Sequence, residues 1–377
     1  MARLGDYIEQ IRGVSYKPED VCSSTDNDAV AILRANNIQD DGLNFDDLVY
    51  VKKSKILDKQ YIQNGDIIVC ASSGSKSLVG KAAIASENFP VAFGAFCKVV
   101  RPKKLIPSYI GYFFQSPKYR STISELSGGA NINNIRNEHI DELDIVIVSE
   151  KEQESIVNQL DDLSNLISLR KQQLSKIDEL VKSRFIELFG DRYTNDKKWD
   201  NKPLYECADF YNGKAHEQVV DENGEYILVT SRCIASDISD YRRTNELLFP
   251  LQVNDIAMVM SDLPNGRALA KCILIDEDGK YTLNQRICCL RNYLFNPIFF
   301  YHLLNRHEYF LSFNDGNAQT NLRKDDLLAC NIIIPPLELQ NQFATFVEQT
   351  DKSKLAVQQS LEKLETLKKS LMQQYFG

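Results

Sequence analysis

Nine cysteines and four histidines are the side chains best suited to metal binding or nucleophilic chemistry. No two cysteines have the two-residue spacing that zinc sites prefer. His302 and His307 are five residues apart, so they do not share a helix face as an i, i+4 pair would. The odd number of cysteines also argues against a full disulfide framework. We therefore expect reduced thiols, packed mostly in the core, and no metal site.

The segment from Gly74 to Lys81 superficially suggests a phosphate-binding loop. Five residues rather than four separate Gly74 from Gly80, however, and Ala82 stands where a magnesium-binding Ser or Thr is needed. The sequence also contains no Asn-Pro-Pro-aromatic methyltransferase motif and no Pro-Asp nuclease motif followed by a spaced acidic-x-Lys. The motifs therefore predict a chain that is not itself an enzyme.

Composition is ordinary for a globular protein, with 43% hydrophobic and 25% charged residues. The sequence has no apolar run of membrane-spanning length and no apolar signal core at its N-terminus. We therefore expect a cytoplasmic protein that does not associate with a membrane. The net charge is −8 and the pI is about 5.3. Because phosphate contacts need clustered Lys and Arg, this charge argues against a protein that grips DNA unaided.

An internal repeat dominates the sequence. Asn134-Ile135-Arg136 recurs as Asn321-Leu322-Arg323, an offset of 187 residues that holds without a gap to the end of the chain. At the same offset Gln153 matches Gln340, and Phe189-Gly190 matches Phe376-Gly377. The chain is one unit written twice, and we divide it into two globular domains, residues 1–149 and 191–336, and two helical tails, residues 150–190 and 337–377.

Each tail has the pattern of one long helix. Ser149 and Glu152 have the spacing of a capping box, and no Pro or Gly follows until Gly190. About forty residues at 1.5 Å each give a helix roughly 60 Å long. Apolar residues then recur at steps of four and three, as in a coiled coil, and we expect the two tails to pair antiparallel. The predicted seam consists of Ile156, Leu160, Leu163, Ile167, Leu174, Ile177 and Val181 in the first tail, and Phe343, Val347, Val357, Leu361, Leu364 and Leu371 in the second.

The globular halves have a mixed pattern. Short buried strands are expected after Gly65 and from Asp255, and strands over residues 145–148 and 332–334 should close each half. Asn134 and Asn321 are expected as helix N-caps. The predicted fold class is α+β: two repeated mixed α/β domains separated by a long antiparallel two-helix coiled coil, with a pseudo-two-fold internal repeat.

Three segments resemble a known family. Gly65–Lys81 resembles the strand-loop motif of target-recognition domains in specificity subunits of type I restriction-modification enzymes, and Gly316–Leu322 resembles their Gly-x-x-Gln-x-Asn-Leu loop. Leu337–Gln342 resembles the start of their helical regions, and the likeness covers essentially the whole chain. Two segments depart from the pattern: Gly128–Ile135 has no Gln at the expected place, and Ser261–Arg267 replaces a Ser-Gly-rich loop. The two halves should therefore read different bases.

The resemblance implies a subunit that recognises a bipartite site in double-stranded DNA, with one domain for each half-site. It implies two modification (methyltransferase) subunits and two restriction (ATP-dependent translocase and nuclease) subunits as partners. S-adenosylmethionine, ATP and Mg are then expected on those partners, and no cofactor in this chain. Two alternatives remain open: a DNA-recognition subunit of another modification or defence system, or a scaffold for other partners with two binding modules on a coiled coil.

Base edges are read by Arg, Lys, Asn, Gln, Ser and Thr side chains from loops. Arg136 and Arg323 recur in both halves, so they are interpreted as phosphate or structural contacts rather than base readers. The predicted DNA-binding residues are Arg34, Asn36, Ser73, Lys76, Asn131 and Asn133 in the first half, and Arg232, Asn265, Arg267, Gln319 and Thr320 in the second.

Overall fold

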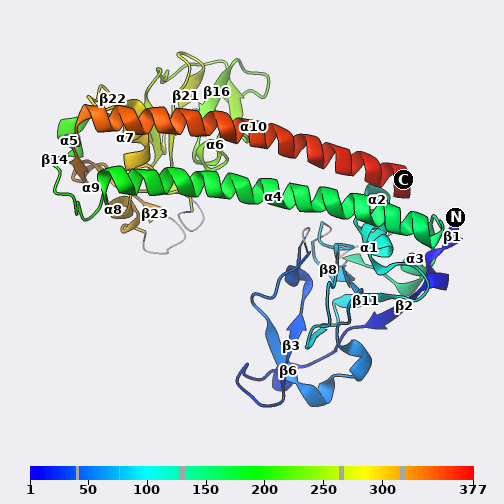
Figure 1. Cartoon of the computed structure of the whole chain (residues 1–377). Helices are drawn as coiled ribbons and strands as arrows, with labels where there is room; N and C mark the ends of the chain where they lie inside the picture. The colour runs from blue at the N-terminus through cyan, green and yellow to red at the C-terminus, as the bar shows by residue number, and fades with distance from the viewer. Residues whose placement is uncertain (40–41, 76, 127–132, 263–266, 315–319) are drawn as a thin grey trace. The chain divides into compact units, whose positions relative to one another are not determined.

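The computed structural model describes residues 1–39, 42–75, 77–126, 133–262, 267–314 and 320–377. Contacts between Cα atoms divide the chain into two compact units: unit 1 comprises residues 1–171 and 359–377, and unit 2 comprises residues 172–358. Each unit combines small sheets and short helices with parts of two long helices (Figure 1). The division cuts each long helix, whereas the boundaries predicted from the sequence lie at the ends of the tails.

Unit 1 contains two main sheets. Its strands are β1 (Ala2–Arg3), β2 (Ile8–Arg12), β3 (Ala29–Leu33), β4 (Ile38–Gln39), β5 (Gly42–Leu43), β6 (Val49–Lys52), β7 (Ile67–Cys70), β8 (Ser72–Ser73), β9 (Ala82–Ile84), β10 (Val91–Phe93), β11 (Cys97–Pro102), β12 (Asn133–Asn134) and β13 (Asp144–Ile145). An antiparallel sheet has the order β2-β11-β7-β9, and a mixed sheet has the order β10-β3-β6 with β3 and β10 parallel. Three short pairs, β1-β13, β8-β12 and β4-β5, complete the unit.

The helices of unit 1 lie between and after these strands. They are η1 (Leu4–Tyr7), η2 (Pro18–Asp20), η3 (Ala35–Asn37), η4 (Lys53–Lys55), η5 (Asp58–Gln60), α1 (Pro107–Gln115), α2 (Pro117–Leu126), α3 (Asn137–Asp141), the first part of α4 (Glu150–Phe189) and the end of α10 (Leu337–Phe376).

Unit 2 repeats the arrangement. Its strands are β14 (Asn201–Pro203), β15 (Asp209–Asn212), β16 (Tyr226–Val229), β17 (Arg242–Thr244), β18 (Ile256–Val259), β19 (Ser261–Asp262), β20 (Cys272–Leu274), β21 (Tyr281–Leu283), β22 (Ile287–Arg291), β23 (Thr320–Asn321) and β24 (Asn331–Ile333). Its short helices are α5 (Leu204–Cys207), α6 (Ser231–Ala235), α7 (Pro297–Leu304), α8 (Glu308–Leu311) and α9 (Lys324–Leu328). The sheets β15-β22-β18-β20 and β17-β16-β21 match the two main sheets of unit 1, and the pairs β14-β24 and β19-β23 match β1-β13 and β8-β12.

The central strand of each four-stranded sheet is buried on both faces. In β7, Ile67 and Val69 pack in the core beside the helices, while Ile68 and Cys70 pack against the three-stranded sheet. β18 alternates in the same way between the two cores of unit 2. Because side chains alternate along a strand, a continuous apolar run is what a strand between two layers requires. The two predicted buried strands, β7 and β18, therefore lie in the middle layer of units 1 and 2 respectively.

An ion pair between a buried carboxylate and a half-buried arginine recurs beside each central strand. Asp66, which is 1% exposed, accepts from Arg101 Nε at 2.7 Å, and its other oxygen accepts from the backbone N–H of Gln63 at 2.8 Å. In unit 2, Asp255 accepts from Arg291 Nε at 2.7 Å and from the backbone N–H of Gln252 at 2.8 Å. Each carboxylate thus joins the turn before the central strand to the neighbouring strand.

The two long helices pack antiparallel, as predicted, within each unit. In unit 1, Leu160 of α4 lies in one core with Met372 and Phe376 of α10, and Tyr375 Oη donates to Gln159 Oε1 at 2.9 Å. In unit 2, the later residues Phe185 and Phe189 of α4 lie in one core with the early residues Phe343 and Val347 of α10. Lys171–Glu365 at 3.3 Å and Lys354–Asp178 at 2.6 Å are ion pairs between the helices inside units 1 and 2 respectively.

The residues of the proposed seam are all buried or half-buried. Additional buried positions lie beside the seam, because each helix packs on a globular half as well as on the other helix: Val157, Phe185, Phe189, Ala344, Met372 and Phe376. The seam residues and these flanking positions together make an apolar face wider than a two-helix coiled coil alone would need.

The first long helix begins with the predicted capping box, and a buried glutamine recurs near the start of both long helices. Ser149 Oγ accepts from the backbone N–H of Glu152 at 3.4 Å, and the Glu152 carboxylate accepts from the backbone N–H of Ser149 at 3.0 Å, which is a capping box. Gln153 accepts from the backbone N–H of Ile106, and the matching Gln340 accepts from that of Asn296. The repeat thus keeps one buried glutamine that joins each tail to its own globular half.

The predicted caps Asn134 and Asn321 are wrong. Both residues lie in short strands, β12 and β23, and the N-cap positions of α3 and α9 are Arg136 and Arg323. The physical reason is pairing with distant strands: Ser72 lies opposite Asn134, and Ser261 lies opposite Asn321. This pairing places both asparagines in strands, so each helix begins further along the chain.

The buried side chain of His307 makes the stability of unit 2 depend on pH. The side chain is 2% exposed, and its Nδ1 atom accepts from the backbone N–H of Tyr309 at 3.1 Å. Burial, together with the charge of Arg192, lowers the pKa of His307 to about 4 from an ordinary 6.5. The unfolded chain therefore binds more protons between pH 6.5 and 4, so stability is lost as the pH falls through this window.

We expect His307→Asn to make the free energy of unfolding of unit 2 less dependent on pH between 6.5 and 4. Asn can still accept a hydrogen bond at this N-cap but does not titrate. Urea unfolding at a series of pH values, followed by hydrogen exchange in unit 2, measures the slope. An unchanged slope would show that other groups control the acid response. The matched control is His139→Asn, which lies in unit 1 and should leave the slope for unit 2 unchanged.

All nine cysteines lie in the described part of the chain and are free thiols. Within that same part, no helix is both long and apolar enough to cross a membrane, and no group of three or more His, Cys, Asp or Glu side chains is placed to hold a metal ion.

Candidate nucleic-acid interface

The structure brings two of the predicted reading segments of unit 1 together. Ser73 in β8 lies directly opposite Asn133 in β12 in an antiparallel pair. In unit 2, Thr320 lies opposite Asp262 in the equivalent pair of β23 and β19. Segments far apart in the sequence therefore meet at the same place in both units. Four further predicted residues lie outside the described residues: Lys76, Asn131, Asn265 and Gln319.

The same two backbone hydrogen bonds close the loop between the paired strand and the next strand in both units. The backbone N–H groups of Gly80 and Cys70 donate to Cys70 O at 2.9 Å and to Lys81 O at 2.8 Å respectively. In unit 2, Ala270 donates to Val259 O at 2.9 Å and Val259 donates to Lys271 O at 3.0 Å. Gly80 and Ala270 both have a positive φ, 77° and 56°. Below we name residues 77–81 loop A and residues 267–271 loop B.

Arg34 and Asn36 of unit 1 lie together after strand β3. Arg34 Nη2 donates to Asp47 Oδ2 at 2.9 Å and to Asp47 O at 2.8 Å, and Asn36 Nδ2 donates to the same carboxylate at 3.3 Å. Asp47 is 81% exposed at its side chain. The carboxylate thus orients two predicted base-reading side chains at the surface.

Arg232 occupies the equivalent region of unit 2, in α6 after strand β16. Its Nε donates to Asp240 Oδ2 at 2.5 Å, and its side chain is 71% exposed. An exposed ion pair of this kind adds little to stability. Among the described residues its two Nη groups have no hydrogen-bond partner, and this end of a guanidinium can donate to guanine O6 and N7. The ion pair thus restrains the arginine side chain and leaves its two Nη groups available to donate hydrogen bonds.

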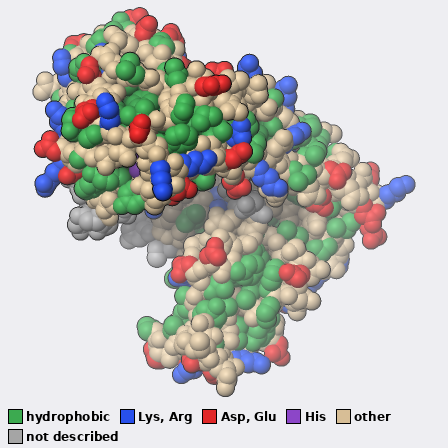
Figure 2. All heavy atoms as spheres, turned by 60° about the vertical axis from the view of Figure 1, so that its left-hand side comes forward, with side chains coloured by type: hydrophobic (Ala, Val, Ile, Leu, Met, Phe, Trp, Pro, Cys, Tyr) green, Lys and Arg blue, Asp and Glu red, His purple; other side chains and the backbone are tan. Residues whose placement is uncertain are grey.

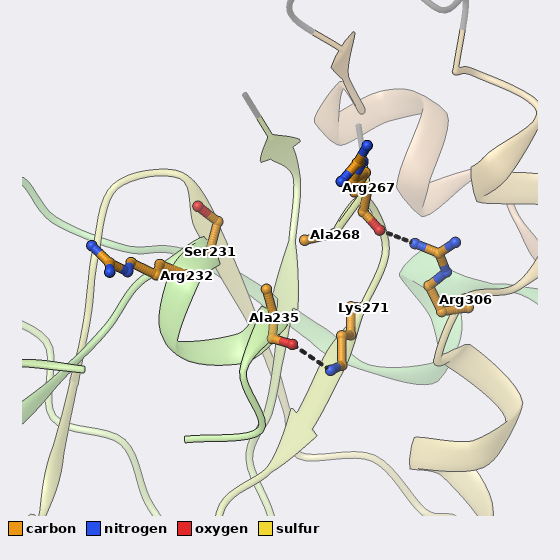
Figure 3. Close-up of a pocket in the computed structure, with 7 residues that line it drawn as sticks. All are labelled: Ser231, Arg232, Ala235, Arg267, Ala268, Lys271 and Arg306. Carbon is orange, nitrogen blue, oxygen red and sulfur yellow. Dashed lines mark hydrogen bonds between the residues drawn. The ribbon is translucent and has the colours of Figure 1, made fainter. Parts of the chain in front are cut away.

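A cationic hollow of about 600 Å³ lies between α6 and loop B. It is lined by Ser231, Arg232, Ala235, Arg267, Ala268, Lys271 and Arg306 (Figure 3). Lys271 Nζ donates to Ala235 O at 2.9 Å and pairs with Asp237 at 2.8 Å. Arg267 is exposed, and its guanidinium makes no ion pair or hydrogen bond with the described residues. The hollow can therefore accept an anionic or base-edge ligand through Arg232 and Arg267.

Arg136 and Arg323 are exposed at matching positions, immediately before α3 and α9. Each follows a paired strand, β12 or β23, by two residues or fewer. Their interpretation as phosphate or structural contacts stays a prediction, as does the role of every proposed reading residue.

Cations do not form one continuous basic surface on the face that Figure 2 shows. Lys and Arg side chains alternate there with Asp and Glu side chains. This pattern agrees with the net charge of −8. Phosphate attraction on this face would be local rather than general.

Sequence reasoning missed two arginines, Arg120 and Arg306, that contact loops A and B. Their partners are backbone carbonyl oxygens, which leave no mark on the sequence. The offset of 187 residues holds only from Asn134 onward, and the offset of 190 residues that relates Gly80 to Ala270 pairs Arg120 with Phe310. The repeat therefore gave no signal for these two arginines.

The family model of the type I restriction modification DNA specificity domain matches this chain twice, over residues 1–179 and residues 196–367. The chain therefore belongs to the family of type I restriction-modification DNA specificity domains. The two matches agree with the internal repeat and with the two equivalent units.

Two curated relatives are similar over part of the chain. It is 44% identical over 173 residues to the type I restriction enzyme StySPI specificity subunit of Salmonella potsdam, and 42% identical over 195 residues to the EcoKI specificity subunit of Escherichia coli strain K12. These matches cover 46% and 51% of this chain. They span only 37% and 42% of the lengths of the two relatives.

Solved structures share the fold over almost the whole chain. The type I restriction-modification S subunit from M. genitalium matches with a TM-score of 0.55 at 15% identity, covering 100% of this chain and 95% of that one. A structure that describes complex assembly and conformational transition of the type I R-M system matches with a TM-score of 0.56 at 15% identity, covering 98% and 97%. At this identity the likeness establishes the fold alone.

Proposed function

We propose that this chain is the DNA-specificity subunit of a type I restriction-modification enzyme. Each unit reads one half of a bipartite site in double-stranded DNA, and the chain itself carries out no catalysis. The observation that carries the proposal is the recurrence, in a chain of this family, of one folded unit whose paired strands bring distant predicted reading segments together in both copies.

The two halves should read different sequences. The same backbone hydrogen bonds close loops A and B, but the side chains of the two loops differ. Ser77 and Leu78 in loop A occupy the positions of Arg267 and Ala268 in loop B. A shared frame with different side chains is the arrangement expected of two readers with different targets.

Catalysis is proposed to come from partners. We propose that the chain assembles with modification (methyltransferase) subunits and restriction (ATP-dependent translocase and nuclease) subunits, two of each. The repeat supports equal numbers, because two equivalent units offer two equivalent surfaces. S-adenosylmethionine, ATP and Mg would then be bound by the partners and not by this chain.

The experiment is a gel-shift assay with the purified chain, alone and with the modification subunit added. Because the chain is acidic, we expect weak binding alone at physiological salt and strong, sequence-dependent binding in the complex. Tight sequence-specific binding by the chain alone would contradict the proposed division of phosphate contacts. Absence of sequence-dependent binding by the complex would contradict the function itself.

A scaffold for other partners is the second candidate, and the net charge of −8 favours it. The same assay separates the candidates, since a scaffold would leave the affinity of the modification subunit for DNA unchanged. A recognition subunit of another modification or defence system would bind DNA with a different partner. The identity of the neighbouring genes distinguishes that case.

A further inference from the structure

Arg120 of unit 1 joins α2 to loop A. Its Nη1 atom donates to Val79 O at 3.0 Å, and its Nη2 atom donates to Ser77 O at 2.8 Å. One planar guanidinium thus spans two carbonyl oxygens of the loop. Such a contact uses the fixed geometry of the donors, which a lysine does not reproduce.

Arg306 of unit 2 makes the equivalent contacts with loop B. Its Nη1 atom donates to Arg267 O and, at 3.5 Å, to Leu269 O, and its backbone N–H donates to Ala270 O at 2.8 Å. Figure 3 shows the hydrogen bond from the Arg306 guanidinium to the backbone carbonyl oxygen of Arg267. Arg306 therefore holds loop B at three carbonyl oxygens, those of residues 267, 269 and 270.

The acceptors correspond in the two units, but the arginines do not occupy the same local structure. Ser77 and Arg267 hold one position of the shared loop frame, and Val79 and Leu269 hold another. Arg120 lies inside α2, whereas Arg306 lies in the turn between α7 and α8 with a φ of 55°, a conformation that L residues rarely adopt. The same loop contact is thus made from two different backbones.

The location of these contacts favours a local role over a global one. Arg306 is exposed and Arg120 is half-buried, so neither belongs to the apolar cores. Charged donors make stronger hydrogen bonds to carbonyl oxygens than neutral donors do. The bonds fix the backbone just before the hydrogen-bonded residues Gly80 and Ala270, and in unit 2 they fix the backbone that carries Arg267.

We propose that Arg120 and Arg306 are positioning residues for DNA recognition. Each holds the backbone of its loop so that the loop presents side chains to one half-site, and each sets how sharply that half-site is read. The proposal rests on the proposed function, and it assigns to these arginines a role through the loop rather than through direct contact with DNA.

The test uses Arg306→Lys and Arg120→Lys in the full chain with its modification subunit. Both variants keep the positive charge but lose the two-carbonyl geometry, so each is the control for the other half of the site. The recognised sequence is first read from methylated genomic DNA. Binding is then measured with a duplex of that sequence and with duplexes altered at one base in either half.

We expect Arg306→Lys to reduce discrimination against altered bases in one half-site by about tenfold, an effect on the scale of one lost base contact, and to leave the other half-site unchanged. Arg120→Lys should show the reverse pattern. In the chain without DNA, hydrogen exchange of the amides of Ala270 and Lys271 should become faster in Arg306→Lys and stay unchanged in Arg120→Lys.

Three results would overturn the proposal: full discrimination in both lysine variants, equal losses in both half-sites, or unchanged amide exchange in loop B of Arg306→Lys. Full discrimination with lysine would mean that only the charge matters. A wild-type complex without any sequence preference would instead contradict the proposed function, and the role of the two arginines in specificity with it. The hydrogen-exchange data alone would then still report whether Arg306 holds loop B.

Discussion

Replacing Phe376 with alanine should lower the free energy of unfolding of unit 1 by about 3–5 kcal/mol, the usual cost of truncating a buried aromatic side chain. Phe376 is 2% exposed at the last turn of α10, and its ring lies 5.1 Å from that of Tyr109 and 6.3 Å from that of Phe113. The ring therefore attaches the end of the chain to the globular part of unit 1, and its loss should leave a cavity and release the last helical turns.

The matched residue Phe189 makes the prediction specific. It is fully buried in unit 2, 4.7 Å from Phe299 between ring centroids, so Phe189→Ala should destabilise unit 2 instead. Urea unfolding followed by hydrogen exchange assigns each transition to a unit. Leu367→Ala, at a 47% exposed position of α10, is the control and should change little. A loss below about 1 kcal/mol for Phe376→Ala would contradict the packing of α10 in unit 1.

Asp255→Ala should destabilise unit 2 by about 3 kcal/mol, the lower end of the cost of breaking a buried ion pair, because it leaves the half-buried guanidinium of Arg291 without its partner. Both carboxylate oxygens bind Arg291, at 2.7 and 2.6 Å, and one also accepts from the backbone N–H of Gln252. The substitution therefore also opens the turn that leads into β18. Asp66→Ala should have the same effect in unit 1.

Two comparisons test the ion pair. Asp240→Ala removes the exposed partner of Arg232 and should leave the midpoint of urea unfolding nearly unchanged. The double change Asp255→Ala with Arg291→Met should cost less than Asp255→Ala alone, since no half-buried charge is then left unpaired. Equal shifts for Asp255→Ala and Asp240→Ala would show that burial does not set the value of the pair.

Patterns that depend on near neighbours were readable from the sequence. The capping box at Ser149, the apolar period of the tails and the buried strand after Gly65 all follow from local spacing, and the repeat indicated that a partner for each helix exists in the same chain. The full width of the apolar face was missed, because positions such as Phe185 and Met372 pack on globular parts, and the spacing of residues alone does not reveal where those parts lie.

Patterns that depend on distant pairing were not readable. β3 pairs in parallel with β10, and Asn134 and Asn321 enter strands through pairing with Ser72 and Ser261, which no local rule predicts. The same limit applies to the candidate interface. The residue types of Arg34 and Arg232 suggested readers, but only the fold shows that Asp47 and Asp240 orient them.

The central claim is that each unit reads its own half-site, and an exchange of one globular half tests it most directly. Residues 1–149 are replaced by the same region of a related specificity subunit, the modification subunit is supplied, and methylated sites are mapped across the genome. We predict that one half of the recognised sequence changes and that the half read by unit 2 is retained. A methylation pattern that changes in both halves would contradict independent reading by the two units.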